Sequence, residues 1–280
     1  AGDEIIISKD EAPEVWYPNQ YLLMISNSNP KKSALARFES HEMPLKKTIH
    51  DKIPDWKINS RNKEQAFAID LLMDPSVKIV SLIGRAGSGK TFVLAQRAVD
   101  SHLRHKGRVL ILTFNISLRN YIHDHISNVR VGLDWKNFYI MHYHGFFKIE
   151  ANNHERELKL NSFDDIDFFE NVKDRIIKFN AIFIDEIQDY KSEWIQIVKK
   201  YFLADGGEFV VFGDEKQNIY HRELSEDTTP NTTIPGKWSS LTDSYRFSNK
   251  IVPLLTRFQK QFFTETYSPD SIVSLRQQEM

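Results

Sequence analysis

The stretch that decides the fold is Ile79-Val80-Ser81-Leu82-Ile83-Gly84-Arg85-Ala86-Gly87-Ser88-Gly89-Lys90-Thr91. It begins with a short apolar run rich in β-branched side chains, which predicts a buried strand that stops at Gly84. A helix-like segment follows at residues 92–102. Between the two lies G-x-x-x-x-G-K-T, the pattern of a phosphate-binding loop, in the context that such a loop requires.

The residue types in this loop suit a chain of phosphates. Gly84, Gly87 and Gly89 permit backbone conformations that a Cβ would block, so successive N–H groups turn inward. These donors and the helix N-terminus surround a phosphate chain with positive potential. Lys90 brings a full charge toward the outer phosphates, and the Thr91 hydroxyl is a suitable hard ligand for Mg²⁺. The loop therefore predicts a bound nucleotide with Mg²⁺.

Composition limits the class of protein. The chain has 280 residues, of which 41% are hydrophobic, enough for one large domain or two smaller ones. It contains no cysteine, which excludes disulfides and thiolate zinc sites and is compatible with the cytoplasm, where we expect it. No leader opens the chain and no apolar run approaches about 20 residues, so we expect no membrane span. With 37 basic and 38 acidic residues, any nucleic-acid contact must come from a local groove.

The chain is expected to have two parts. Short strand-like runs at 4–8, 20–25 and 33–38, separated by Pro, Asn and Ser, predict a small β module over residues 1–57. From 58 to 280, strand-like and helix-like segments alternate, which predicts an α/β domain with a mainly parallel sheet flanked by helices. The expected strands are 78–83, 109–113, 138–141, 181–185 and 208–213, and the expected helices lie near 63–73, 90–104, 116–127, 164–178, 190–203 and 248–264.

Two adjacent carboxylates, Asp185 and Glu186, follow the apolar run 181–184. The carboxyl end of a parallel strand places them beside the phosphate loop. Asp185 suits Mg²⁺, and Glu186 suits the orientation and deprotonation of an attacking water. The alternative is a solvated helix N-terminus, where acidic residues are favoured in any case.

A further strand, 208–212, ends at Gly213-Asp214-Glu215-Lys216-Gln217. The strand delivers polar groups to the same edge of the sheet. Gln217 is suited to hold a water or a γ-phosphate oxygen, although G-D-x-x-Q by itself indicates little more than a turn.

Taken in chain order, several segments resemble motifs of the first motor domain of superfamily 1 helicases of the UvrD/Rep type. The resemblance spans roughly residues 62–260 and implies a RecA-like P-loop NTPase fold, ATP hydrolysis with Mg²⁺, and single-stranded DNA or RNA as partner. The segments are Asn62-Lys63-Glu64-Gln65, Gly84 to Thr91, Leu112-Thr113-Phe114-Asn115, Met141-His142-Tyr143-His144-Gly145-Phe146, Asp185-Glu186-Ile187-Gln188-Asp189, Gly213-Asp214-Glu215-Lys216-Gln217-Asn218-Ile219-Tyr220 and Ser244-Tyr245-Arg246.

The resemblance implies roles for individual residues at the nucleotide. Gln65 reads the adenine edge, Phe92 and Tyr245 stack on the base, and Arg246 reaches the γ-phosphate. The implied nucleotide-binding residues are Gln65, Gly84, Ala86, Gly87, Ser88, Gly89, Lys90, Thr91, Phe92 and Tyr245; the implied catalytic residues are Lys90, Glu186, Gln217 and Arg246; the implied Mg²⁺ ligands are Thr91 and Asp185.

The same resemblance implies that Phe114, Asn115, His144 and Phe146 contact a single strand. Aromatic rings stack on bases in proteins that bind single strands. For Phe114 and Phe146 the alternative is core packing, the commoner fate of phenylalanine. For His144 the alternative is a packed or exposed loop histidine.

The chain departs from the helicase pattern in two respects. We find no second motor domain with its arginine finger in these residues, so we expect a second domain of a longer protein, or a partner, to supply it. Residues 148–180 are too few for the large helical insertion that those helicases carry. The resemblance therefore does not extend to duplex separation by this chain alone.

A second resemblance covers a narrower span. Residues 18–20, 33–38 and 62–72 look like PhoH-type ATPases that follow a PIN nuclease domain, and that group also uses D-E-x-Q and G-D-x-x-Q. No acidic quartet of the PIN type precedes residue 18, and the segments around His144 and Tyr245 favour the helicase type. A PhoH-like RNA-associated ATPase and a nucleotide-dependent switch without unwinding both stay open as alternatives.

Overall fold

The computed structural model describes residues 5–6, 16–26, 28–29, 32–48, 63–84, 89–128, 132–214, 217–218, 220, 222, 224, 229–232, 234, 238–241 and 251–262. For residues 63–65, 83–84 and 240 it describes the backbone alone. The chain divides into two compact units, Ala1–Pro75 and Ser76–Met280.

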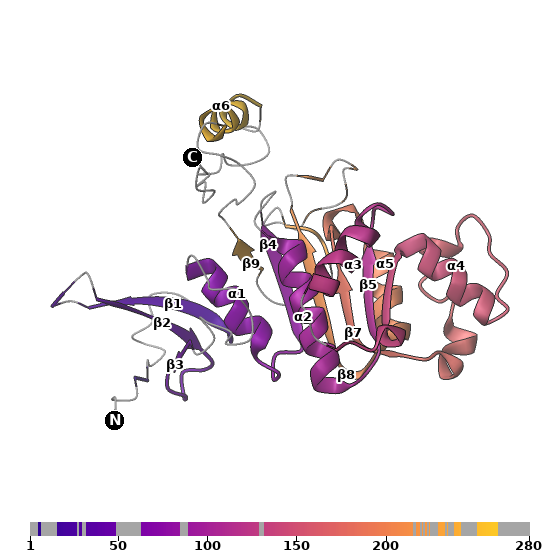
Figure 1. Cartoon of the computed structure of the whole chain (residues 1–280), viewed down its shortest axis with the longest axis horizontal. Coiled ribbons are helices and arrows are strands. Elements are labelled where there is room, and N and C mark those ends of the chain that lie inside the picture. Colours follow the sequence, from indigo (N-terminus) through magenta and orange to yellow (C-terminus); the bar gives the residue numbers. More distant parts are fainter. Residues whose placement is uncertain are drawn as a thin grey trace. The chain divides into compact units, whose positions relative to one another are not determined.

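The first unit is a small antiparallel sheet with one helix (Figure 1). In its described part, strands β1 (Gln20–Ile25), β2 (Ser33–Phe38) and β3 (Lys46–Lys47) pair in that order, and helix α1 (Lys63–Met73) follows. The predicted β module is therefore confirmed as an antiparallel sheet. Of the expected strand at 4–8, only residues 5 and 6 are described, and neither lies in a strand.

Hydrogen bonds, ring stacking and ion pairs between side chains hold helix α1 against this sheet. The Tyr21 hydroxyl donates to Asp70 at 2.8 Å, and the Tyr21 ring stacks on Phe67 with 4.5 Å between centroids. The Arg37 guanidinium pairs with Asp70 at 3.7 Å and with Asp74. These contacts put α1 in the first unit, which ends at residue 75, whereas composition alone suggested a division between residues 57 and 58.

The second unit is built on a parallel sheet. Its described strands are ordered β6-β5-β7-β8-β4-β9, and every pairing between neighbours is parallel. This topology confirms the expected RecA-like sheet. The strands are β4 (Ile79–Gly84), β5 (Val109–Thr113), β6 (Phe138–His142), β7 (Phe179–Ile184), β8 (Leu203–Gly213) and β9 (Ser239–Leu241).

Helices cover both faces of this sheet (Figure 1). Because strand side chains alternate between faces, Ile182 and Ile184 of β7 enter one hydrophobic cluster, while the equally buried Ala181 and Phe183 point to the other side. This cluster also contains residues of helices α4 (Tyr143–Asn153) and α5 (Ser192–Ile197), and α5 continues as a short π-helix (Val198–Phe202). Helices α2 (Lys90–His105) and α3 (Leu118–Asn128) cover the opposite face of the sheet. Helix α6 (Val252–Phe262) is the last described helix.

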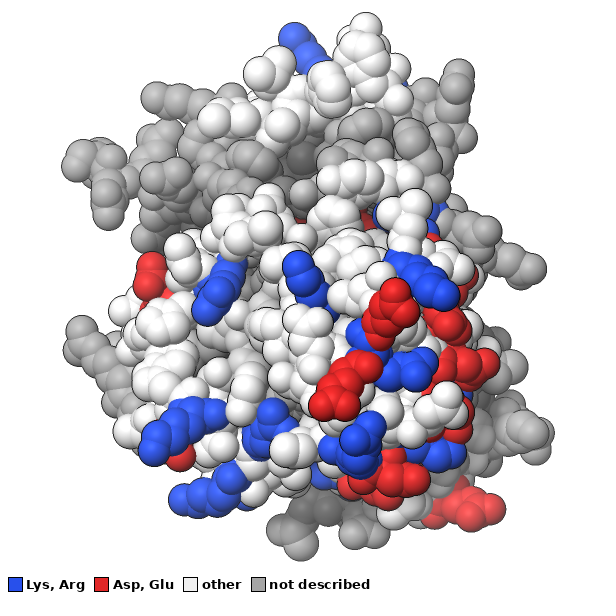
Figure 2. All heavy atoms as spheres, turned by 90° about the vertical axis from the view of Figure 1, so that its right-hand side faces the viewer, with Lys and Arg blue, Asp and Glu red and all other residues white. Residues whose placement is uncertain are grey.

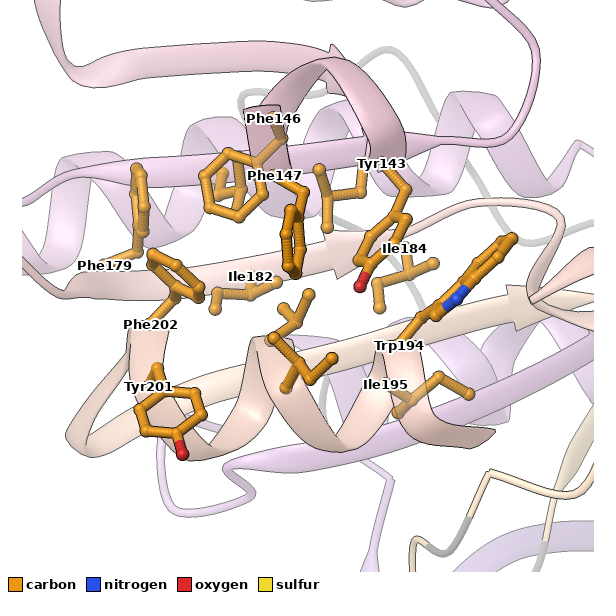
Figure 3. Packing of buried hydrophobic residues seen from close by; sticks show 14 of the residues in the cluster. Tyr143, Phe146, Phe147, Phe179, Ile182, Ile184, Trp194, Ile195, Tyr201 and Phe202 are labelled. Atoms are coloured by element: carbon orange, nitrogen blue, oxygen red, sulfur yellow. The ribbon is translucent and has the colours of Figure 1, made fainter. Parts of the chain in front are cut away.

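The cluster between the sheet, α4 and α5 is rich in aromatic rings (Figure 3). Phe146 packs edge-on against Phe202 with 4.8 Å between centroids, and Tyr143 stacks on Trp194 at 4.7 Å. Phe147 contacts Phe163, Phe168 and Phe169, each at 5.0 Å. Residues from the segments that follow β6 and β7 thus share one core.

The expected helix near 164–178 is wrong. The chain there forms short 3₁₀ turns, Ser162–Asp164 and Glu170–Arg175, between irregular stretches. The physical reason is that its acidic side chains are bound by the α5 segment: Asp164 accepts from Trp194 Nε1 at 2.6 Å, and Lys200 lies 2.9 Å from both Asp167 and Glu170. The predicted amphipathic helix face is replaced by these side-chain contacts.

Helix α4 is not among the expected helices; the sequence indicated only that residues 141–146 resemble a helicase motif. Gly145 lies inside it, and a Cβ at that position would come 2.5 Å from the imidazole of His142. The glycine that lowers helix propensity is therefore required for packing at the start of the helix. Among the described residues, no helix is both long and apolar enough to cross a membrane.

Candidate functional site

The candidate nucleotide site lies at one edge of the parallel sheet. Strands β4, β7 and β8 are neighbours and run in the same direction, so their carboxyl ends meet there. The polar residues at this edge come from three segments: Lys90 and Thr91 begin α2, Asp185 and Glu186 follow β7, and Asp214 and Gln217 follow β8.

The phosphate loop is described only at its ends. Gly84 is the last residue of β4, and Gly89 adopts φ of +89°, a conformation that side chains with a Cβ rarely take. Lys90 and Thr91 then open α2. The predicted loop residues Ala86, Gly87 and Ser88 lie outside the described residues.

Thr91 and Asp185 meet across 94 positions of sequence. The Thr91 hydroxyl donates to Asp185 Oδ2 at 3.1 Å, and the Glu186 N–H donates to Asp185 Oδ1 at 3.1 Å. Asp185 is 1% exposed. The hydroxyl and carboxylate oxygens are the ligand types that Mg²⁺ takes, so the predicted pair fits that ion.

The described residues contain no group of three or more His, Asp or Glu side chains that would cage a metal ion. Mg²⁺ in nucleotide sites is held by one or two protein oxygens, waters and substrate phosphates rather than by a full protein cage. The Thr91 and Asp185 pair therefore suits Mg²⁺ that arrives with a nucleotide, and does not suit a zinc-like ion.

Asp185 sits in a strongly perturbing environment. Its burial and the negative charge of Glu186 raise the pKa of Asp185 to about 7, against the opposing effects of Lys90 and Thr91. A bound cation would favour the ionised carboxylate and lower that pKa again. Ion binding and loss of the Asp185 proton are thus coupled near neutral pH.

Lys90 is 7% exposed, and its Nζ lies 3.8 Å from Asp214 Oδ2. An ammonium group buried to this extent needs a counter-charge. Asp214 supplies one here, and the outer phosphates of a nucleotide offer a stronger one. The predicted phosphate-binding lysine is therefore held at the edge of the sheet by an acidic residue of the next motif.

A chain of amides links the two acidic motifs. Gln188 Nε2 donates to Glu186 Oε2 at 2.9 Å, and Gln188 Oε1 accepts the Asp214 N–H at 3.0 Å. The Gln217 side-chain amide in turn donates to Asp214 Oδ2. Glu186, predicted to act on the attacking water, and Gln217, predicted to hold a water or a γ-phosphate oxygen, are thus joined through Gln188 and Asp214, which had no assigned role.

Two features allow this chain of contacts. A Cβ on Gly213 would meet Ile187 at 2.8 Å and Gln188 Oε1 at 3.3 Å, so glycine permits the close approach of the two segments. Glu186 has φ of +54° and ψ of +47°, a left-handed conformation that is uncommon for residues with a side chain. Such backbone strain is typical of functional sites. The letters D-E-x-Q-D and G-D-x-x-Q are the sequence signal for Gln188 and Asp214.

Of the residues predicted to contact a single-stranded nucleic acid, some lie at the surface and one lies in the core. Phe114 is partly buried, with its ring 5.0 Å from that of Tyr220. Asn115 is exposed, and its Oδ1 accepts from the N–H and the hydroxyl of Ser117 at 3.0 and 2.9 Å. Phe146 is 2% exposed inside the aromatic core, which is the alternative that the sequence left open for it. Its ring offers no face to a strand.

His144 is exposed, and its ring lies edge-on to Trp194 at 4.7 Å. Partial burial and the neighbouring His142 lower the pKa of His144; Asp164 opposes this effect, and Lys191 and Arg222 add to it. The imidazole is therefore uncharged at neutral pH and is suited to stacking or neutral hydrogen bonding rather than to an ion pair.

Arg222 is a residue at this edge that sequence reasoning missed. Its Nε donates to the Asp189 carbonyl at 3.2 Å, and its guanidinium lies over the rings of Trp194 and Tyr220 at 5.6 and 5.7 Å. The only sequence signal is its place two residues after the end of the G-D-x-x-Q-x-I-Y motif at Tyr220. Burial and Glu186, against the effect of Arg222, raise the pKa of Asp189 to about 6.

The predicted contacts to the base are placed less completely. The Phe92 ring lies edge-on to His125 of α3 at 5.9 Å. Gln65 is in α1, with only its backbone described. Tyr245 and Arg246 lie outside the described residues. The structure therefore brings Thr91 to Asp185 and Lys90 to Asp214, and of the residues assigned to the base it describes only the side chain of Phe92.

Figure 2 looks onto the end of the second unit that carries α4. Over one half of this face, acidic and basic side chains alternate closely. Among the described residues, Lys173 pairs with Glu170 at 2.6 Å and Lys191 with Asp164 at 2.6 Å. In that half of the face, contact with a nucleic-acid strand would depend on individual side chains rather than on a broad basic field.

Comparison with protein families gives one match. A family described as "AAA domain" matches residues 65–223. The matched region runs from α1 through both acidic motifs and so contains most of the site described above.

Comparison with curated proteins finds two relatives. The chain is 33% identical over 92 residues to Protein PhoH2 of Bacillus subtilis, a match that covers 33% of this chain and 21% of that protein. It is 39% identical over 57 residues to Protein PhoH2 of Thermobispora bispora, covering 20% of this chain and 13% of that protein. The matches thus span about a fifth or less of the length of these relatives.

Comparison with solved structures finds helicases at low similarity. An arterivirus nonstructural protein 10 helicase, solved with DNA, is 11% identical with a TM-score of 0.37, over 99% of this chain and 60% of that chain. Pif1 helicase from Candida albicans is 14% identical with a TM-score of 0.43, over 72% of this chain and 44% of that chain. The fold assignment above stands on the sheet topology itself.

Proposed function

The chain belongs to the AAA domain family, and from that premise we propose that it hydrolyses ATP with Mg²⁺ and couples hydrolysis to the binding of single-stranded nucleic acid. In this proposal the chain is the first motor domain of a UvrD-like superfamily 1 helicase. A second motor domain or a partner then supplies the arginine finger.

One observation carries the proposal, the 3.1 Å hydrogen bond between the Thr91 hydroxyl and the Asp185 carboxylate. It places two hard oxygens from distant segments beside the end of a phosphate loop. If bound there, Mg²⁺ would supply positive charge that offsets the negative charge developing during transfer of the terminal phosphoryl group. Thr91 and Asp185 are the residues that would hold it.

The other residues of the edge have roles that follow from their chemistry. Lys90 exchanges its contact with Asp214 for the outer phosphates. Glu186, held by Gln188, orients the attacking water and accepts its proton. Gln217 holds the same water or a γ-phosphate oxygen. These contributions are positioning and electrostatic stabilisation, which supply most of the catalysis in phosphoryl transfer.

Further contacts enter the proposal from the motif resemblance alone. Gln65, Phe92 and Tyr245 recognise the base, and Arg246 contacts the γ-phosphate. For the nucleic acid, the proposal relies on Phe114, Asn115 and His144. Phe146 is left out because its ring is buried in the core.

The test is the rate of ATP hydrolysis with and without single-stranded DNA or RNA at low salt. We expect stimulation by a strand, no hydrolysis and weaker nucleotide binding for Lys90→Ala, and retained ATP binding with very slow turnover for Glu186→Gln. The exposed Lys148 offers a control, since Lys148→Ala removes the charge of a lysine that is not among the residues assigned to the nucleotide. Unchanged turnover in Lys90→Ala would refute the assignment, and wild-type turnover in Glu186→Gln would reassign the role in activating water.

The second candidate function is a PhoH-like, RNA-associated ATPase. It is favoured by the 33% identity with PhoH2 of Bacillus subtilis over 92 residues. A strong preference for RNA over DNA in the same assay, or a ring-shaped oligomer in solution, would support it. Nucleotide binding without strand binding at low salt would instead support a switch module, because electrostatic strand contacts are strongest under that condition.

A further inference from the structure

Tyr190 follows the D-E-x-Q-D motif directly and has an unusual hydroxyl. The residue is 3% exposed, yet its Oη has no hydrogen-bond partner in the described structure. Other tyrosines of the same core are satisfied: Tyr143 donates to the Phe163 carbonyl at 3.0 Å, and Tyr201 donates to Glu170 at 2.9 Å. A buried hydroxyl without a partner destabilises the folded state, so Tyr190 requires an explanation that its neighbours do not.

The ring of Tyr190 packs among three other aromatic rings, one of which is Phe114, the proposed nucleic-acid contact. It lies edge-on to Phe114 at 6.1 Å, to Tyr143 at 6.1 Å and to Trp194 at 5.9 Å. Phe114 is the partly buried ring proposed to stack on a base. A shift of the Phe114 ring therefore acts on Tyr190 directly, because aromatic cores are close-packed and transmit displacement.

The backbone of Tyr190 joins the acidic motif. Its N–H donates to the Ile187 carbonyl at 3.0 Å within the turn Ile187–Asp189, whose preceding residue is the strained Glu186. Burial and the charge of Asp185 raise the pKa of Tyr190 far above its ordinary value, so the hydroxyl stays protonated and acts as a donor. Asp189 Oδ1, one residue earlier, is also buried without a partner.

We propose that Tyr190 is a positioning residue that couples strand binding at Phe114 to the nucleotide and Mg²⁺ beside Asp185. In the free protein its hydroxyl is unbonded. When nucleotide and ion bring a water or phosphate oxygen to Asp185, that oxygen accepts the hydroxyl, and a base stacked on Phe114 favours the same ring position. This inference rests on the proposed function, since it requires that the chain bind both ligands.

The coupling must be reciprocal. If a strand tightens nucleotide binding through Tyr190, then nucleotide tightens strand binding by the same factor. The measurement is the dissociation constant of a nonhydrolysable ATP analogue with Mg²⁺, with and without oligo(dT) or oligo(U), and the dissociation constant of the oligonucleotide with and without the analogue. The full chain is used throughout.

The test variant is Tyr190→Phe, which removes the hydroxyl and keeps the ring. Because an unbonded buried hydroxyl is lost, we expect the melting temperature to rise by about 2–4 °C. We expect the oligonucleotide alone to bind as in the wild type and the analogue alone to bind more weakly, because the oxygen that the nucleotide brings loses the hydroxyl donor. The coupling, about 5-fold or more where such sites communicate, should fall to about 1-fold.

The matched control is Tyr201→Phe, which makes the same substitution in the same aromatic core. Tyr201 lies in the π-helix that continues α5, at the opposite end from Trp194 (Figure 3). Tyr201 is 2% exposed and its hydroxyl is bonded. Loss of the Tyr201 hydroxyl should lower the melting temperature and leave the coupling between nucleotide and oligonucleotide binding unchanged. Opposite shifts in stability from identical substitutions would identify the Tyr190 hydroxyl as the unsatisfied one.

Unchanged coupling in Tyr190→Phe overturns the inference, as does a fall in its melting temperature, which would mean that the hydroxyl is bonded in the free protein. A wild-type chain that binds no strand, or shows no coupling, overturns the proposed function together with the inference. Wild-type coupling that persists in Tyr190→Phe removes Tyr190 alone and leaves the proposed function standing.

Discussion

Gln188 donates a hydrogen bond from its side-chain amide to the Glu186 carboxylate, with 2.9 Å between Nε2 and Oε2. The other end of the amide accepts the N–H of Asp214 at 3.0 Å. Because Gln188 is 2% exposed, water does not replace these contacts easily. The side chain therefore fixes the carboxylate that follows β7 relative to the end of β8.

Gln188→Leu should lower the turnover number of ATP hydrolysis by about 10–100-fold, the usual effect of losing a partner that orients an active-site group. The Michaelis constant should change little, since the contact acts on the water-activating residue rather than on nucleotide binding. Steady-state kinetics measure both. Gln96→Leu, at a buried glutamine of α2 that is 7% exposed, is the control; an equal loss of turnover there would mean that the effect comes from packing.

Thr91→Val should abolish the Mg²⁺ dependence of nucleotide binding. The substitution keeps the shape of the side chain and removes the hydroxyl that lies 3.1 Å from Asp185 Oδ2. Thr91→Ser keeps the hydroxyl and should retain the dependence. Titration of an ATP analogue with Mg²⁺ and with EDTA measures the difference. Equal Mg²⁺ dependence in Thr91→Val and Thr91→Ser would place the ion elsewhere.

The stability of the nucleotide-free protein should fall as pH rises. Burial and Glu186 raise the pKa of Asp185 to about 7, whereas an unfolded aspartate titrates near about 3.9. Between these values the folded state binds more protons than the unfolded state, so stability is present at low pH and is lost as pH rises toward about 7. Melting curves in EDTA from pH 4.5 to 7.5 measure the slope.

Asp185→Asn should flatten this slope, because the amide does not titrate. A smaller slope of the same sign should remain, since burial and Glu186 also raise the pKa of Asp189 to about 6. Nucleotide with Mg²⁺ should restore stability at pH 7.5 in the wild type only. An identical pH slope in Asp185→Asn would show that other groups carry the dependence.

Elements that are buried on both faces were predictable from sequence. Strand β5 (Val109–Thr113) coincides with its expected bounds because all five residues are buried, and a short apolar run of this kind fits only a central strand. The segment 164–178 was not predictable. Phe168, Phe169, Val172 and Ile176 have a helix-like spacing, but contacts of neighbouring acidic side chains with the α5 segment decide the backbone.

The candidate site shows the same division. Thr91 and Asp185 were predictable, because parallel strands deliver their carboxyl ends to one edge regardless of side-chain packing. The motif letters point to Gln188, but the contacts of Gln188, Tyr190 and Arg222 were not predictable, because they depend on the strained turn at Glu186 and on rotamers that no sequence period encodes. Phe146 shows the converse, since its motif position suggests a surface whereas the unforeseen helix α4 turns its ring into the core.

Glu208→Gln should destabilise the second unit without changing its chemistry. Glu208 is 0% exposed and lies 2.9 Å from Arg97 Nη2, Arg104 Nη2 and His105 Nε2. Neutralising one partner of a buried pair leaves unpaired charge and costs about 3–5 kcal/mol. Urea unfolding measures the change. Lys173→Gln, in a pair with Glu170 at an exposed site, is the control and should change stability little, because solvent screens such a pair.

Phe114→Leu should weaken binding of a single strand while leaving its salt dependence unchanged. Loss of a stacked base costs about 1–3 kcal/mol, and the salt slope reports phosphate contacts that this substitution does not remove. Phe146→Leu is the matched control. It makes the same substitution at a phenylalanine that the motif resemblance also assigned to the single strand, but this side chain is only 2% exposed. That change should lower stability and leave affinity intact. Oligonucleotide titrations at two salt concentrations, with melting curves for both variants, separate the roles; weaker binding in Phe146→Leu at full stability would return that ring to the strand-binding surface.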